Sequence, residues 1–509
     1  MRGIYSRNRG FALSIVTILF FCLVVNSSWK AIPDGALYLE LGESIARGEG
    51  YVFNGEPHTY VPPGYPVVVA ATVATVGKSF LAYRFLMACL GLLTAAAGYL
   101  LVLRLCGQDT AFLAGGLFAI NYVLLYNSTF TSSDVPFALA VFLALHVVIS
   151  AAGKKNILLW SIPAGIVAGL PALIRINGLG VPPAEAFFLF CSCRGRSLWS
   201  RLFACGVFLV ASVLPTAAWE VHKASFPVSF QEGTYLNAVT GRTLGTQSAI
   251  ILRAVWDYIY ETSYALSGVS LKTGFLELII PCLALLGIIA AFRKDERLLV
   301  PLTLIQFCGL LLSPAGSRYL IVLIPGLYLF LALGVLQVLG WIEKNSTARY
   351  RKFLEPKRVV PAIFAVLACI NIAHNLVTVV QARNGLERGG AESYRDLPFF
   401  TSGRWLAHNA TDGVVMTMHP RVIHYLSGLP SVELVRSGVP EHEVWVDAGE
   451  QIQQLIISRR PTYFFSDATN VSLYRQVLEA LETLGLKLEK VDQVGASERF
   501  CLWRVMRKE

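Results

Sequence analysis

The sequence predicts a multi-pass α-helical membrane protein with a small α/β domain at its C-terminal end. The chain has 509 residues, of which 55% are hydrophobic and only 15% charged, and its mean hydropathy is +0.56. A soluble chain carries about 25% charged residues. Long apolar runs recur up to about residue 380, with Lys and Arg concentrated in the short segments between them. Beyond residue 381 the charge rises and the long apolar runs stop.

The apolar runs predict about eleven membrane spans, since a spanning helix needs about 20 largely apolar residues. The first is interpreted as a retained signal anchor, because Arg2, Arg7 and Arg9 precede it and no clean small-residue cleavage site follows it. The predicted spans are residues 11–29, 80–103, 110–127, 135–152, 157–174, 177–192, 202–219, 274–292, 298–313, 319–341 and 359–380.

Residues 64–77 are apolar but short, which favours an interfacial or re-entrant segment over a span. If they crossed the bilayer, the basic end of the next span, at Arg104, would face outwards. Without that crossing the basic segments all fall on the cytoplasmic side, together with the N-terminus, as the positive-inside rule requires. The net charge of +10 is therefore explained by topology, and nucleic-acid binding is excluded. The same alternation places a long loop, 220–273, outside.

Residues 381–509 predict a small α/β domain on the outer face, separate from the membrane domain of residues 1–380, whose first outer loop spans 30–80. Alternating strand and helix patterns indicate this architecture. Only Cys501 lies in this segment, so it has no disulfide framework. The predicted strands are Val414–Met418, Thr462–Phe465, Leu486–Val494 and Phe500–Val505, and the predicted helices are Phe399–Asn409, Glu450–Arg459 and Ser472–Leu484.

The candidate functional residues gather on the predicted outer face. A sugar hydroxyl is a weak nucleophile that a carboxylate can activate as general base. A lipid-phosphate leaving group is matched by the guanidinium fork of Arg. Asp34, which follows the first span, is the candidate base, and Glu40 and Glu43 are further acids of the same loop. The candidates for binding the donor phosphate or substrate are Arg47, His58, Tyr60, Asp134, Arg175, Arg318 and Tyr319.

Structural roles are equally open for several of these residues. Asp34 follows a proline and precedes an apolar-periodic run, as a helix N-cap does. Asp134, followed by Pro136, also has the pattern of a helix start, and for it the cap is favoured. Arg175 and Arg318 are also placed to extend their charged ends to the membrane interface.

The order of several short motifs resembles the polytopic GT-C glycosyltransferases. The chain is similar to bacterial protein O-mannosyltransferases, the aminoarabinose transferase of lipid A and Rgt-type lipopolysaccharide glycosyltransferases, over about residues 10–430. The motifs that carry the resemblance are Asp34-Gly-Ala-Leu-Tyr38, Tyr60-Val-Pro-Pro-Gly-Tyr-Pro66, Thr131-Ser-Ser-Asp-Val-Pro-Phe137, Gly169-Leu-Pro-Ala-Leu-Ile-Arg175, Ser317-Arg-Tyr-Leu-Ile-Val-Leu-Ile-Pro325, Trp405-Leu-Ala-His-Asn409 and Tyr425-Leu-Ser-Gly428.

The resemblance implies a GT-C-like fold in a bacterial plasma membrane and an inverting transfer of sugar from a polyprenyl phosphate. The acceptor would be a lipid, glycan or protein of the envelope. Asp34 would be the base, with Arg318 and Arg175 near the donor phosphate. Protein O-mannosyltransferases carry Asp-Glu where this chain has Asp34-Gly35, and aminoarabinose enzymes place a Glu before the proline pair, where Glu56 is nearest. The second acid and any divalent metal therefore stay open, and neither named activity is assigned.

Two other functions fit a polytopic chain. A lipid-linked oligosaccharide ligase or polymerase would depend on the late loop 220–273 instead of the first loop. A transporter or flippase would show paired repeats with interrupted helices and acids within spans. The sequence shows no matched halves and no strong acids in the middle of its spans.

Overall fold

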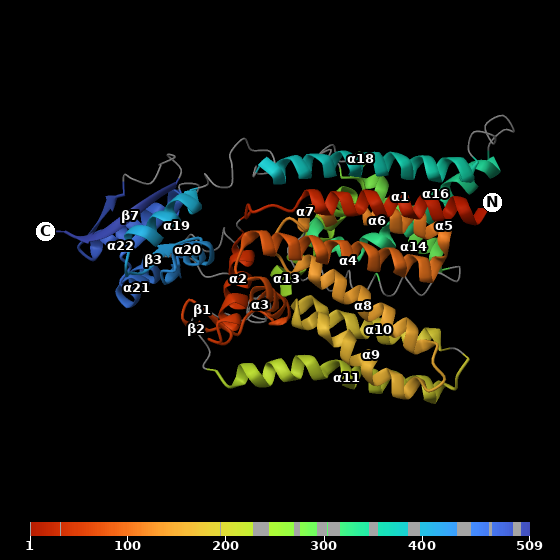
Figure 1. The fold of residues 1–509 in the computed structure, drawn as a ribbon, viewed down its shortest axis with the longest axis horizontal. Helices are drawn as coiled ribbons and strands as arrows, with labels where there is room; N and C mark the ends of the chain where they lie inside the picture. The colour runs from red at the N-terminus through yellow and green to blue at the C-terminus, as the bar shows by residue number, and fades with distance from the viewer. Residues whose placement is uncertain are drawn as a thin grey trace.

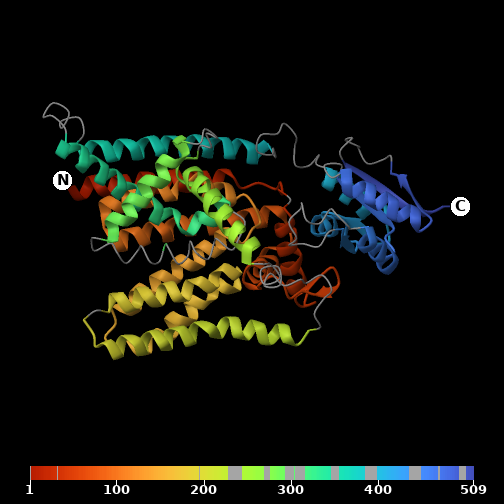
Figure 2. The same ribbon diagram turned by 180° about the vertical axis from the view of Figure 1, so that it is seen from behind.

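The computed structural model describes most of the chain. The described residues are 2–30, 32–193, 195–226, 244–268, 275–292, 303, 316–345, 355–384, 398–434, 449–467, 471–491 and 500–508. The helices of the N-terminal three quarters lie alongside one another, with the N-terminus at one end and the C-terminal domain beyond the other (Figure 1). Figure 2 shows the same arrangement from behind, where the green helices of residues 244–267 and 275–292 lie in front.

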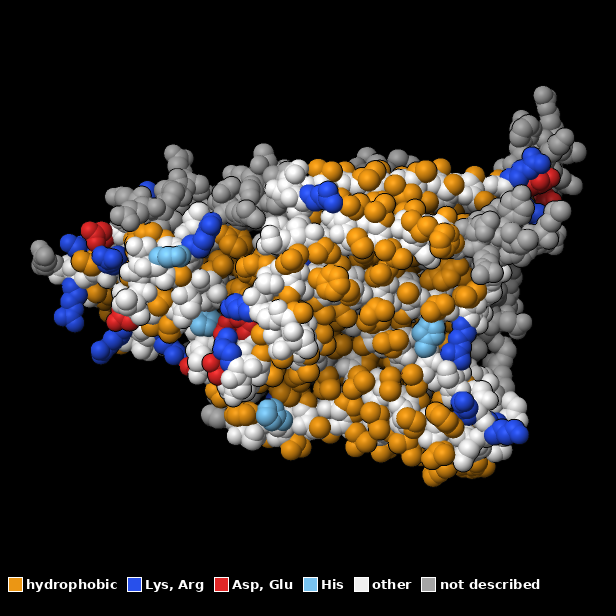
Figure 3. Space-filling view, in the orientation of Figure 1, with side chains coloured by type: hydrophobic (Ala, Val, Ile, Leu, Met, Phe, Trp, Pro, Cys, Tyr) orange, Lys and Arg blue, Asp and Glu red, His pale blue; other side chains and the backbone are white. Residues whose placement is uncertain are grey.

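Six helical segments of the described chain are long and apolar enough to span a membrane. Hydrophobic side chains cover the visible face of this bundle, while charged side chains gather towards its two ends (Figure 3). The multi-pass helical prediction is therefore confirmed. The six segments are α4 (Phe80–Cys106), the run Gln108–Asn127, α8 (Asp134–Ala152), α11 (Leu198–Ala224), α16 (Ile324–Asn345, apolar to Lys344) and α18 (Pro356–Asn384).

The other five predicted spans are shorter in the structure or lie outside the described residues. The first predicted span, residues 11–29, is shorter in the structure, because α1 (Arg2–Leu23) has its apolar part in Gly10–Leu23. The segment predicted at 177–192 forms α10 (Val181–Ser192), which is only 12 residues long. The span predicted at 157–174 is divided between α9 (Ile157–Gly169) and a 3₁₀ turn, η2 (Leu170–Leu173). The span predicted at 274–292 forms α14 (Phe275–Phe292), whose apolar stretch is only Glu277–Ala291. The prediction at 298–313 lies outside the described residues apart from Thr303.

Where the structure describes the predicted loop 220–273, most of it is helical, while its outer location stays a prediction. α11 continues to Ala224, and residues 244–267 form another helix, α13 (Leu244–Ser267). Its apolar side chains recur at helical spacing between polar ones, a pattern that a search for continuous apolar runs misses. α13 packs against α14 and against the 3₁₀ helix η5 (Ser317–Val322).

The run Gln108–Asn127 is not one regular helix, and buried asparagines compensate for its irregularity. It passes through α5 (Gln108–Thr110), the π-helix η1 (Ala111–Gly115) and α6 (Gly116–Ala119) before α7 (Tyr122–Asn127) begins. Asn121 caps α7 and donates to the Ala265 carbonyl oxygen at 2.8 Å. Asn375 donates to the Ile120 carbonyl oxygen at 2.8 Å. Backbone groups away from water need such partners, so these bonds fix α7 against α13 and α18.

The first loop is folded. α2 (Pro33–Ala46) leads to a hairpin of β1 (Val52–Phe53) and β2 (Glu56–Pro57), in which Phe53 pairs with Glu56. Asn54 and Gly55 form its turn with φ of 57° and 79°, the Asn-Gly turn that the right-handed twist of strands favours. The apolar segment after the prolines is α3 (Gly64–Val76), a helix of 13 residues packed on α2. Its interfacial position stays a prediction.

Residues 127–134, which separate two of the predicted spans, are largely buried beneath α2. Thr131 and Ser133 are 1% and 0% exposed. The Tyr38 hydroxyl lies 2.9 Å from Ser133 Oγ, and Trp29 Nε1 donates to Thr131 Oγ1 at 3.3 Å. The polar side chains are buried because they bond to α2 and the segment before it. This contact fixes the start of α2 over the helix bundle.

The C-terminal α/β domain is confirmed. Its five-stranded sheet has the order β4-β3-β5-β7-β6, with β3 parallel to β4 and β5 and β7 antiparallel to β5 and β6. The sequence missed only the short elements β4 and α20. The elements are α19 (Pro398–Asn409), β3 (Val415–Thr417), α20 (Pro420–Ser427), β4 (Ser431–Glu433), α21 (Gly449–Arg459), β5 (Tyr463–Asp467), α22 (Val471–Thr483), β6 (Leu486–Lys490) and β7 (Phe500–Arg507). The predicted boundary at 380–381 falls within α18, and residues 385–397 lie outside the description.

Gly35 lies where α2 approaches the buried segment most closely. A Cβ there would lie 2.5 Å from Thr131 Oγ1 and 3.0 Å from the Thr131 carbonyl oxygen. We therefore expect Gly35→Ala to lower stability by about 1–3 kcal/mol, the usual cost of overpacking. The thermal unfolding midpoint in detergent measures this. Gly206→Ala on α11, where a Cβ meets nothing within 4 Å, is the matched control, and equal midpoints for the two variants would contradict the expectation.

Candidate functional site

A cavity of about 780 Å³ lies where the helix bundle meets the C-terminal domain. Its walls come from α2, the segment before α3, the turns between α9 and α10, the end of α11, η5 and α20. It therefore combines residues far apart in the sequence. The lining residues used below are Asp34, Tyr38, Tyr60, Arg175, Trp219, Lys223, Tyr319 and Arg421.

Asp34 faces this cavity and is paired with an arginine of the C-terminal domain. Its Oδ1 accepts from Arg421 at 2.9 Å, and its side chain is 47% exposed. The alternative that Asp34 caps α2 is wrong, because Ile32 is the N-cap residue and no side chain makes the capping bond. Asp34 lies in the first turn, where the helix dipole favours a negative charge.

Arg175 lines the same cavity and holds a buried carboxylate. It donates to Asp134 at 2.7 Å and to Ser133 Oγ at 3.0 Å. The Asp134 side chain is only 2% exposed. Asp134 does begin α8, with Pro136 in the first turn, but the N-cap is Ser133 and makes no side-chain capping bond. Asp134 therefore pairs with Arg175 instead of capping its helix, and it does not itself line the cavity.

Two guanidinium groups lie close to the ring of Tyr319. Arg175 Cζ lies 4.9 Å and Arg318 Cζ 4.8 Å from the centre of its ring, and Arg318 donates to its hydroxyl at 2.7 Å. Tyr319 also lines a second cavity, of about 460 Å³, together with Arg318, Glu261 and Tyr264. In the described part of the chain no ion pair joins Arg318 to a carboxylate.

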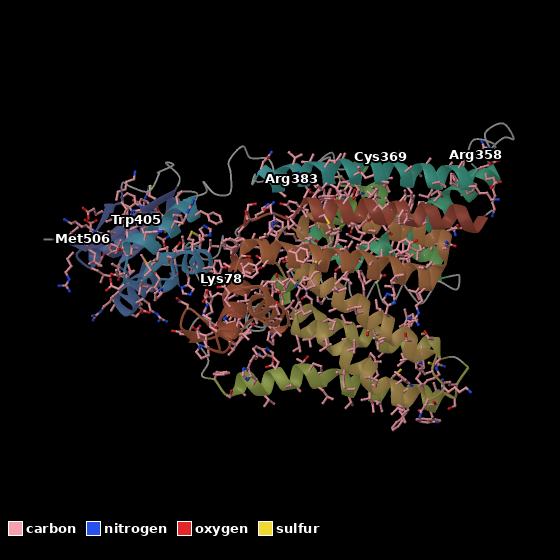
Figure 4. The ribbon with its side chains drawn as sticks, viewed as in Figure 1. Lys78, Arg358, Cys369, Arg383, Trp405 and Met506 are labelled. Carbon is pink, nitrogen blue, oxygen red and sulfur yellow. The ribbon has the colours of Figure 1, made fainter. Side chains whose placement is uncertain are left out.

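Glu43 is the buried acid of the first loop, and it binds groups from three other segments. Its Oε1 accepts from Tyr83 at 2.7 Å and from Tyr425 of α20 at 2.8 Å. Lys78 lies 2.6 Å from Oε2 and its ammonium lies over the Tyr425 ring. Figure 4 places Lys78 at the junction of the bundle and the C-terminal domain. Glu43 therefore fastens that domain to the bundle.

Three predicted site residues lie outside both cavities, Asp134 among them. Arg47 faces acids of its own loop, with Glu49 at 2.8 Å and Glu40 at 3.2 Å. His58 Nε2 accepts from the Val61 amide at 3.2 Å, which shapes the turn before the prolines. Glu56, the candidate second acid, faces Arg459 of α21 at 3.6 Å. Tyr60, by contrast, lines the larger cavity.

Within the described residues, no group of three or more His, Cys, Asp or Glu side chains has metal-binding geometry. Asp34 and Glu43 are each engaged by cations or hydroxyl groups, which do not suit a ligand set. We therefore derive no catalytic step through a metal.

Sequence reasoning missed Arg421 and Glu261. Arg421 follows Pro420 in a short helix with no functional pattern, and only the docking of the domain brings it to Asp34. Glu261 lay inside the segment interpreted as loop. Burial raises its pKa at the wall of the second cavity, as desolvation does for any carboxyl group.

Comparison with known proteins supports this arrangement. Residues 60–219 match the dolichyl-phosphate-mannose-protein mannosyltransferase family. The chain aligns with ArnT from Cupriavidus metallidurans, solved with undecaprenyl phosphate, over 97% of both chains, at 14% identity and a TM-score of 0.59. The archaeal oligosaccharyltransferase AglB from Archaeoglobus fulgidus, solved with an inhibitory peptide and a dolichol phosphate, aligns over 94% of this chain and 72% of its own, at 13% identity and a TM-score of 0.55.

The chain has the GT-C membrane fold. The resemblance inferred from its motifs is thereby confirmed, and the matched family segment contains Tyr60 and Arg175 of the cavity wall. The family match covers residues 60–219, and the solved structures add the likeness of the fold. An uncharacterised protein of Aquifex aeolicus (strain VF5) is 26% identical over 223 residues, and the alignment spans 42% of this chain and 44% of that protein.

The partly buried His58 predicts a pH dependence. Burial, and secondarily the charge of Arg421, lowers its pKa from the usual 6.5 to about 3. The unfolded chain therefore binds a proton near pH 6.5 that the folded chain binds only near pH 3. The contribution of His58 to stability is present above pH 6.5 and is lost as the pH falls from 6.5 towards 3. The thermal unfolding midpoint in detergent should fall over this pH range. It should fall less in His58→Gln, because the side chain at position 58 then binds no proton. Parallel curves would contradict this assignment.

Proposed function

We propose that the chain moves a sugar from a polyprenyl phosphate to an envelope acceptor on the outer face of the membrane, with inversion at the anomeric carbon. The observation that carries this proposal is that a carboxylate, Asp34, lines one cavity with Arg175 and Tyr319. Arg318 lines the second cavity, which shares Tyr319 with the first. A base for the acceptor and a cation for the leaving phosphate thus line one cavity, with a further cation at its neighbour. ArnT and AglB, which share the fold, were solved with polyprenyl-type phosphates.

The proposed reaction is a single displacement. The acceptor hydroxyl oxygen bonds to the anomeric carbon as the bond from that carbon to the phosphate oxygen breaks. The bonding electrons leave with the phosphate, whose growing charge faces Arg318 and Arg175. The hydroxyl proton passes to Asp34. Fixed cations at the position of developing charge stabilise the transition state more than the ground state.

The identity of the acceptor is constrained only by the shape of the cavity. The wall formed by the end of α11 carries Trp219 and Lys223 beside Asp34, and an aromatic face with a neighbouring cation suits a sugar or an amphipathic headgroup. The acceptor is therefore proposed as a lipid, glycan or protein of the cell envelope.

The decisive variant is Asp34→Asn, which keeps the size of the side chain and removes the base. We expect the rate of sugar transfer from polyprenyl-phosphate donors in purified membranes to fall about 10²–10⁴-fold. A panel of donors identifies the sugar. Glu482→Gln is the matched control, because Glu482 also makes a 2.9 Å ion pair but lies in the C-terminal domain with Lys508. Normal transfer by Asp34→Asn would refute the proposed mechanism.

Arg318 is predicted to bind the donor phosphate. Removing a charged hydrogen-bond donor costs about 1.5–3 kcal/mol, so Arg318→Ala should raise the KM for the donor roughly 10- to 100-fold. Arg318→Lys should recover part of this, because Lys keeps the charge but lacks the fork. Arg358→Ala is the control, since Arg358 is 69% exposed at the far end of the bundle (Figure 4). An unchanged donor KM in Arg318→Ala would exclude this role.

A further inference from the structure

We infer that the C-terminal domain completes the active site, with Arg421 as the residue that positions Asp34. Docked on the first outer loop, α20 presents Arg421 to the carboxylate, and sugar transfer requires this docked arrangement. The inference rests on the proposed function of Asp34, and it gives the C-terminal domain a defined part in catalysis.

The geometry of α20 brings two of its residues to two acids of α2. Arg421 and Tyr425 are four residues apart and therefore lie on one face of this helix of eight residues. Arg421 donates to Asp34 Oδ1 at 2.9 Å, near the start of α2, and Tyr425 donates to Glu43 Oε1 at 2.8 Å, near its end. The two bonds align α20 along α2, so Arg421 reaches Asp34 from a fixed direction.

Other contacts hold the domain independently of Arg421. Asn54, in the hairpin turn, donates to the Ser431 carbonyl oxygen at 3.1 Å and accepts from the Ser431 amide at 3.1 Å. The rings of Phe53 and His424 pack edge to face, with their centres 5.2 Å apart. The rings of Trp29 and Tyr425 do the same, with their centres 5.0 Å apart. Replacement of Arg421 should therefore leave the domain docked.

The ion pair itself suits positioning better than stabilisation. Asp34 is 47% and Arg421 24% exposed, and a pair so accessible to water contributes little to folding. The hydrogen bond from Arg421 engages Oδ1 and so restricts rotation of the Asp34 carboxylate. In the proposed reaction Oδ2 then accepts the proton of the acceptor hydroxyl. Arg421 also lines the cavity with Asp34. A base held in one orientation accepts a proton more efficiently than one that rotates freely.

The test compares wild type with Arg421→Ala, Arg421→Gln and Arg421→Lys in the sugar-transfer assay, using the donor that wild type accepts. We expect kcat to fall about 10- to 100-fold in the Ala and Gln variants, with the KM for the donor changed less than about threefold. Arg421→Lys should recover part of the rate, because an ammonium still pairs with the carboxylate. A purely structural residue would not give this split between kcat and KM or this recovery.

A double variant tests whether Arg421 acts through Asp34. In the Asp34→Asn background, Arg421→Ala should cause no further loss, because residues that act as one unit are strongly non-additive. Arg459→Ala is the matched control, since it removes another arginine of the same domain that faces an acid of the same loop, Glu56, outside the cavity. It should change kcat by less than about twofold.

The outcomes separate this inference from the proposed function. If Asp34→Asn loses transfer while Arg421→Ala keeps the full rate, the inference fails and the proposed function stands. If Arg421→Ala raises the rate, the ion pair is an inhibitory lock and the inference is overturned. If wild type transfers no sugar from any polyprenyl phosphate, both fail. Unfolding midpoints in detergent show whether each variant folds, and additive losses in the double variant would also overturn the inference.

Discussion

The buried ion pair between Arg175 and Asp134 is the contact on which the rest of the candidate site depends. Asp134 begins α8 with almost no exposure, and Arg175 reaches it from the turn after α9. Breaking such a pair leaves an uncompensated buried charge, at a cost of about 3–5 kcal/mol. Arg175 also bonds to Ser133, which contacts Tyr38 of α2, and it lies over Tyr319. One guanidinium therefore fixes the relative positions of α2, α8 and η5.

The close packing of α2 on residues 127–134 explains a departure from the protein O-mannosyltransferases that the chain resembles. Where protein O-mannosyltransferases carry an Asp-Glu pair, this chain has Asp34-Gly35, and Thr131 occupies the space that a side chain at 35 would need. The buried acid of the loop is instead Glu43, further along α2, which binds Tyr83 and Tyr425. The second carboxylate here thus holds the C-terminal domain to the bundle and does not line the cavity.

The GT-C fold constrains the chemistry by bringing together groups from distant parts of the chain. The proposed base comes from α2, the proposed phosphate-binding cations come from the turn after α9 and from η5, and one further arginine comes from α20. All of these lie at the end of the bundle nearest the C-terminal domain (Figure 1). A lipid-linked donor has its reactive phosphate at the membrane surface, so a site at the end of the apolar bundle suits it. Arg104, which bonds to the His146 carbonyl oxygen and to Ser150 near the end of α8, belongs to the opposite end.

The sequence by itself determined the class of the protein and most of its helices and strands. Apolar runs and basic segments identify membrane helices because lipid excludes unpaired charge, and strand and helix periods reveal the C-terminal domain because each depends on local spacing. Motif order also placed Asp34, Arg175 and Tyr319 in one candidate site. Only the tertiary structure decided that Asp34 pairs with Arg421, that Asp134 binds Arg175 instead of capping α8, and that Arg47 and His58 lie outside the cavity. These are contacts between segments up to several hundred residues apart, and the local sequence does not encode which distant partner a charged side chain will meet.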